Sequence, residues 1–99
     1  MLYERRGVSC AHDAKERTAE VHVGPGGGAK AKGRGTVLLD KRGAVVGVDV
    51  EPDAASRAVI MLGAHEDVFR TVDVRLSVTR DARGEVTSVV IHGVDPPTL

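Results

Sequence analysis

Aromatic residues and cysteine are scarce in this sequence. Its 99 residues contain no tryptophan, and the only aromatic side chains are Tyr3 and Phe69. Any core must therefore be built from many small apolar contacts, each of which buries less surface than an aromatic ring. Cys10 is the single cysteine, so no intramolecular disulfide can form, and we expect a reducing, cytoplasmic location.

The sequence also lacks a net charge and a long apolar run. Basic and acidic side chains number 14 each, which argues against a domain that holds duplex nucleic acid by bulk positive charge. No apolar stretch approaches the roughly 20 residues of a membrane helix, so we expect no membrane partner. The balance hides an asymmetry, because residues 1–50 hold 9 basic and 6 acidic side chains, whereas residues 51–99 hold 5 and 8.

The residues that the sequence has in abundance are β-branched. Its 17 valines, 6 threonines and 2 isoleucines make up a quarter of the chain and favour strands over helices. Residues 71–79 alternate strictly between polar and apolar side chains, which is the pattern of a strand with one buried face. Composition and alternation together predict an all-β domain.

An internal repeat organises the expected strands. Residues 18–24 match residues 57–63, and residues 35–50 match residues 76–91, in their apolar positions and glycines. We therefore expect about six strands in two repeated three-stranded meander units, arranged as a small barrel or sandwich. The single domain would comprise an N-terminal segment at 1–17, a first unit at 18–51, a short helical turn from Pro52 to Arg57, a second unit at 57–92 and a tail at 93–99.

Each unit contains a short Asp-x-Arg-Gly segment, Asp40–Gly43 in the first and Asp81–Gly84 in the second. An aspartate at the first position can accept hydrogen bonds from the amides that follow it, and a glycine at the fourth position tolerates the positive φ that closes a hairpin. Both segments are therefore predicted to be hairpin turns, with structural rather than catalytic aspartates.

The second unit is expected to carry an apolar outer face. By alternation, Val59, Met61, Val86 and Val90 point outward there, where the first unit is mostly polar. Such a face has to be covered, either by residues 1–17 or by a partner. A homodimer is the simplest partner, because a twofold axis lets one patch cover itself. These four residues are accordingly our candidate interface.

A glycine-rich stretch at residues 24–35 contains three cations and no acid. Lys30, Lys32 and Arg34 alternate along it, so an extended chain would present them on one side, where they could bind nucleic acid or a phosphorylated ligand. The stretch is not a P-loop, because Arg34 and Gly35 stand where that motif needs lysine and then serine or threonine. A flexible, solvated connection is the competing interpretation.

Residue types suited to metal binding or catalysis are scattered. Cys10 and His12 could serve as nucleophile and base in a small metal-dependent or cysteine enzyme, but no third group orients them. His22, His92 and the run His65–Asp67 lie at no spacing typical of a zinc site. We therefore expect no catalytic residue, no metal site and no cofactor.

The central hairpin resembles that of a known family. Residues 37–50, VLLDKRGAVVGVDV, resemble the strand, Asp-x-x-Gly turn and Val-Gly-containing strand that open PRC-barrel domains. This resemblance implies a small β-barrel used as an accessory or interaction module, and no functional residue carries over. Together with an arginine-rich bacterial composition, it favours a non-enzymatic module for protein interaction or self-association, with anion binding through residues 24–35 as the alternative.

Overall fold

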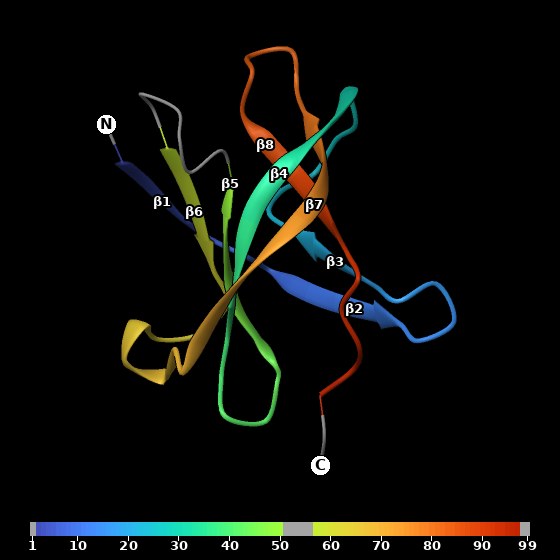
Figure 1. Cartoon of the computed structure of the whole chain (residues 1–99). Coiled ribbons are helices and arrows are strands. Elements are labelled where there is room, and N and C mark those ends of the chain that lie inside the picture. Colours follow the sequence, from blue (N-terminus) through green and yellow to red (C-terminus); the bar gives the residue numbers. More distant parts are fainter. Residues whose placement is uncertain (1, 51–56, 98–99) are drawn as a thin grey trace.

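The alternating valines form strands, and all of these strands belong to one sheet (Figure 1). The computed structural model describes residues 2–50 and 57–97. Its strands are β1 (Leu2–Arg6), β2 (Ser9–Asp13), β3 (Thr18–His22), β4 (Ala29–Leu39), β5 (Val45–Val50), β6 (Arg57–Met61), β7 (Arg70–Arg80) and β8 (Val86–His92). The all-β prediction is confirmed.

Helical structure in the described ranges is limited to one 3-10 turn at His65–Asp67. No helix in these ranges has the length and apolar character needed to cross a membrane. The helical turn that the sequence predicts from Pro52 onward lies outside the described residues.

The sheet is mixed and curls into a half-barrel (Figure 1). Its strand order is β1-β6-β5-β4-β7-β8-β3-β2, with β1 parallel to β6 and the other neighbours antiparallel. The central strands β4 and β7 pair over eleven residues. One curled sheet of eight strands replaces the expected six, because the N-terminal segment supplies β1 and β2.

The expected three-stranded meanders are not formed. β3 pairs with β8 instead of β4, and β6 pairs with β5 instead of β7. The first strand of each unit therefore lies against the last strand of the other unit. Alternation along a strand indicates which of its side chains face the core, but it does not indicate which other strand pairs with it. The predicted pairing within each unit was wrong for this reason.

The two Asp-x-Arg-Gly turns have the same geometry. In each, one carboxylate oxygen of the aspartate accepts hydrogen bonds from the backbone N–H groups two and four residues later, with N···O distances of 2.8–3.0 Å. Gly43 and Gly84 have φ values of +85° and +82°, in the left-handed region that favours glycine. The structural role predicted for Asp40 and Asp81 is confirmed.

Each hairpin also contains one extra residue after its turn. Val46 in β5 and Thr87 in β8 have no counterpart in the hairpin ladder, so the register shifts at these points. Strict alternation would place the Val86 side chain on the outer face. Because of the bulge at Thr87, this side chain points into the main core instead. Val86 is thus a core residue rather than an outward one.

The main core fills the concave side of the half-barrel. Its fully buried larger side chains are Ile60, Leu76, Ile91, Val21, Val37, Val48, Val50 and Val89. Phe69 is exposed, so the core is aliphatic among the residues whose side chains are described. The core is therefore made of contacts between small aliphatic side chains, as the scarcity of aromatic residues predicts.

Val59 and Met61 lie on the outer face, as alternation predicts, but their own chain covers them. They pack with Val46 into a second apolar cluster that Leu38 and Val68 flank. Only 8% of Val59 and 1% of Met61 is exposed. This part of the outer face is covered within the chain, and β1 of the N-terminal segment lies beside it, with Glu4 and Arg6 in register with Val59 and Met61.

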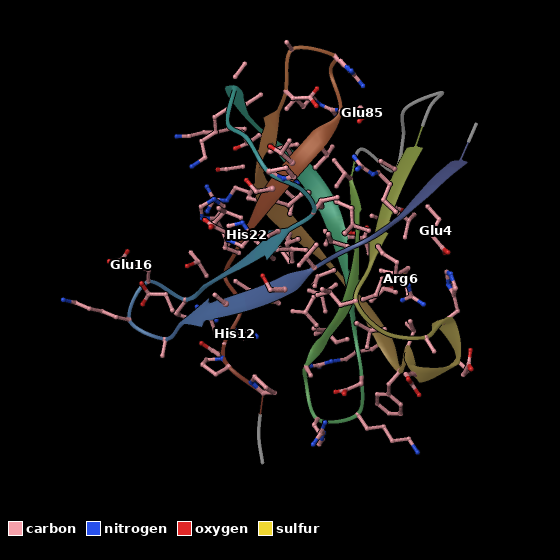
Figure 2. The ribbon with its side chains drawn as sticks, turned by 180° about the vertical axis from the view of Figure 1, so that it is seen from behind. Glu4, Arg6, His12, Glu16, His22 and Glu85 are labelled. Carbon is pink, nitrogen blue, oxygen red and sulfur yellow. The ribbon has the colours of Figure 1, made fainter. Side chains whose placement is uncertain are left out.

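The N-terminal segment also joins the two edges of the sheet. β1 lies along β6 and β2 lies along β3, as one continuous arm (Figure 2). Between them, the Gly7 amide donates to the Met61 oxygen at 2.8 Å, and the Val8 amide donates to the His22 oxygen at 2.7 Å. A Cβ at position 7 would lie 2.7 Å from Cδ2 of Leu62, so a larger residue there would have to displace this side chain.

Gly35 lies where β4 approaches its neighbours closely. A Cβ added there would be 2.4 Å from Cδ1 of Leu76 and 2.5 Å from the backbone oxygen of Asp49. We expect Gly35→Ala to lower the free energy of unfolding by about 1–3 kcal/mol in urea denaturation. Gly33→Ala is the control, because a Cβ at Gly33 meets nothing within 4 Å. Equal losses in both variants would contradict this explanation.

The Asp40 turn predicts a pH dependence of stability. The amide of Ala44, followed by the amide and guanidinium of Arg42, holds the pKa of the Asp40 carboxyl below its ordinary value. Because folding lowers this pKa, the stabilisation is fully present above the ordinary value of about 3.9 and is lost as pH falls through the lower folded-state value.

Asp40→Ala should therefore be less stable than the parent protein at neutral pH, and the gap should close as the solution is acidified. Denaturant midpoints at several pH values measure the gap. Asp67→Ala, which removes an exposed carboxylate outside both hairpin turns, is the control. A gap that stays constant down to strongly acidic pH would argue against the charged carboxylate as its source.

Candidate functional site

The glycine-rich stretch is a strand over much of its length. β4 begins at Ala29, so the three cations of this stretch, Lys30, Lys32 and Arg34, belong to a strand. The loop expected over residues 24–35 is correspondingly short, and the flexible-connection interpretation is wrong for the strand part. Pairing with β7 over eleven residues orders this segment, and no local pattern within the stretch indicates that pairing.

The three cations project from the convex face of the sheet. Gly35 and Val37 of the same strand face the core, and side chains alternate along a strand. Lys30, Lys32 and Arg34 therefore share the opposite face, as the sequence predicts for an extended chain, and all three are exposed. The row extends over about 13 Å, given a rise of about 3.3 Å per residue.

The neighbouring strands add residues that the sequence analysis missed. Arg75 of β7 lies directly opposite Arg34, and Ser77 lies opposite Lys32. On the other side of β7, His92 of β8 lies opposite Arg75. These residues are brought together only by the register between the strands. Their spacing along the sequence therefore could not have predicted that they lie close together. We define the basic face as Lys30, Lys32, Arg34 and Arg75.

A small hollow opens on the basic face. It measures about 300 Å³, and its polar lining side chains are Lys32, Arg75, Ser77 and His92. Oγ of Ser77 and Nε2 of His92 lie 2.9 Å apart, within hydrogen-bonding distance. Two cations and two further hydrogen-bonding side chains around one hollow can bind a phosphate or carboxylate group.

Among the described residues, no ion pair involves any of the four cations of the basic face. The same face also carries acidic side chains, among them Glu20, Asp49 and Asp73. Glu20 pairs with His22 at 2.7 Å, and Asp73 accepts a hydrogen bond from Thr36 at 3.2 Å. Arg34 and Arg75 lie directly opposite each other, and like charges in such positions on adjacent strands repel.

The four candidate interface residues do not form an exposed patch. Val59, Met61 and Val86 are buried, whereas Val90 is half-buried. Val90 lies on the convex face, opposite Ser77 and beside the hollow. The apolar surface on which a self-association site would depend is therefore mostly internal.

Cys10 and His12 are close together without forming an activated pair. The Sγ and Nε2 atoms lie 4.0 Å apart on β2. Burial raises the pKa of the Cys10 thiol, whereas a nucleophilic cysteine needs a lowered pKa. His65 pairs with Glu4 of β1. Across the described ranges, no three His, Cys, Asp or Glu side chains are grouped in a way that could hold a metal ion.

The opposed arginines predict a measurable repulsion. Arg75→Gln should raise the free energy of unfolding by about 0.2–1 kcal/mol at low salt, because it removes a like charge opposite Arg34. The gain should shrink at high salt. Arg34→Gln should give a similar gain, and the double variant should gain less than the sum. Strictly additive gains, or an equal gain from Arg83→Gln in the β7–β8 turn, would contradict a repulsive pair.

Comparison with known proteins adds no relative. No protein-family model matches the chain, and no curated protein or solved structure matches it either. The resemblance to PRC-barrel domains therefore rests on residues 37–50 alone, and the basic face is the feature from which a function can be inferred.

Proposed function

We propose that the protein is a non-enzymatic module that binds the phosphate backbone of nucleic acid through its basic face. The observation that carries the proposal is the placement of Arg34 directly opposite Arg75, with Lys30 and Lys32 in the same row and no ion pair to any of them in the described structure. A bound polyanion would compensate this charge and remove the repulsion.

The arrangement suits an extended ligand. Lys30, Lys32 and Arg34 follow one strand, and Arg75 broadens the row on the neighbouring strand. Serine and threonine hydroxyls from β7 and β8 lie beside these cations, and such groups commonly contact phosphate and sugar oxygens. These contacts position a backbone without identifying its bases.

We do not expect bases to stack on the basic face. Proteins that bind single strands through their bases stack those bases on aromatic rings. Phe69 lies beside Leu39 at the far end of β4, where its amide donates to the Leu39 oxygen. The basic face is therefore suited to backbone binding that tolerates many sequences.

Self-association, the first expectation from the sequence, has less support. Three of its four residues are buried within the chain, and Val90 alone offers little apolar surface.

We also infer that the sheet is built from two copies of one unit with exchanged first strands. In the strand order, each strand of the first unit has a counterpart in the second at the same distance from the opposite edge of the sheet. The counterparts are β3 and β6, β4 and β7, and β5 and β8, with β1 and β2 at the two edges. The Val46 oxygen accepts the amides of two consecutive residues after β6, and the Thr87 oxygen accepts those of two consecutive residues after β3. Matching turns and matching bulges support the same inference.

Nucleic-acid binding can be tested with a short fluorescein-labelled DNA oligonucleotide. We expect its fluorescence anisotropy to report binding at low salt that weakens steeply as salt rises. Lys32→Gln/Arg75→Gln should weaken binding and lower the slope of log K against log salt by about 0.7 for each cation that contacts a phosphate of a single strand.

The matched control is Lys15→Gln/Arg42→Gln, which removes the same charge from two exposed turns outside the basic face, the second at the opposite end of β4 from Lys30. It should leave the salt slope unchanged. Absence of binding at low salt, or equal effects of the two double variants, would overturn the proposal.

A further inference from the structure

A second basic feature lies at one end of the half-barrel. The β4–β5 turn and the C-terminal segment approach this end (Figure 1), and the structure has a concavity of about 550 Å³ there. We call this concavity the mouth. Val37 of the core lies at its base, and Val72, which is 39% exposed, forms part of its wall. The volume is typical of small-molecule sites.

Cations from three separate parts of the chain converge on the mouth. Its charged lining residues are Arg17, Lys41, Arg42, Arg70 and Asp95. Four positive charges therefore face one negative charge, in a protein whose total charge is zero. Arg70 lies opposite Leu39, whose side chain faces the core, so Arg70 projects on the concave side.

The rim is held in place by the chain itself. Arg17 has a positive φ of 54°, which is uncommon for a residue with a side chain. Its Nε and Nη2 atoms donate to the two carboxylate oxygens of Asp95 at 2.9 and 3.4 Å, and its backbone oxygen accepts the amides of Gly93 and Val94. These contacts neutralise Arg17 in part and fix one side of the mouth.

The opposite side of the mouth carries less compensated charge. Lys41 and Arg70 have no ion-pair partner among the described residues, and Arg42 reaches Asp40 only at 3.9 Å. The mouth thus combines a fixed, partly neutralised side at Arg17 with two cations, Lys41 and Arg70, that have no ion-pair partner among the described residues. Convergent cations bind a compact ligand with several anionic groups more tightly than a ligand with one.

We propose that the mouth binds a small oligoanion, a molecule that carries two or more phosphate or carboxylate groups. The mouth opens on the concave side of the sheet, whereas the basic face lies on the convex side, so this site is independent of nucleic-acid binding. The two proposals can therefore fail or succeed separately.

The test uses the full chain, with tripolyphosphate and citrate as probes. We expect one or both to shift the amide resonances of Gly43, Val72 and Gly93 in proton–nitrogen correlation spectra. Lys41→Gln/Arg70→Gln should weaken the affinity at least about tenfold, since it removes two charge-assisted contacts. Binding of tripolyphosphate but not citrate would identify a phosphate ligand, and the reverse a carboxylate ligand.

Lys30→Gln/Lys32→Gln is the charge-matched control. It should weaken oligonucleotide binding and leave the affinity of the mouth for its probe unchanged. The proposal is overturned if neither probe binds, if the shifts are confined to amides of the basic face such as those of Lys32 and Ser77, or if the two double variants weaken probe binding equally.

Discussion

The eleven-residue antiparallel pairing of β4 with β7 is the constraint on which the other features depend. It joins the β4–β5 hairpin to the β7–β8 hairpin at the centre of the sheet. The register that turns Gly35 and Val37 toward the core also places Arg34 opposite Arg75. Burial of apolar surface contributes about 25 cal/mol per Å² over the whole core, whereas the arginine repulsion costs at most about 1 kcal/mol. Core packing therefore enforces an unfavourable pair that an anionic ligand can relieve.

The proposed duplication gives the opposed arginines a second explanation. Arg34 and Arg75 occupy equivalent positions in β4 and β7, and residues beside a pseudo-twofold axis face their own counterparts. Symmetry alone can therefore place arginine against arginine. Lys30 and Lys32, in contrast, correspond to a threonine and an aspartate in β7. The concentration of cations at the start of β4 is thus specific to the first unit. The proposed duplication does not explain this difference between the two units.

Features that depend on a few adjacent residues were predictable, and features that depend on strand neighbours were not. The turns at Asp40 and Asp81 follow from an aspartate and a glycine that interact within a few positions. The bulge at Thr87, in contrast, reverses the face of Val86, and alternation carries no sign of it. The grouping of Arg75 with the β4 cations depends on pairing between residues far apart in the sequence, which a local period does not encode.

Zero net charge determines how this protein can attract anions. Attraction at long range depends on total charge, so a neutral protein steers its ligands weakly. At physiological salt, the pull of a charge cluster is confined to about 8 Å. The basic face and the mouth lie on opposite sides of the sheet. The basic face is a row of cations, whereas the mouth is a concavity lined by cations. Because each would act only at short range, we expect the shape of the cation arrangement, rather than the number of charges, to decide which anion each of them binds.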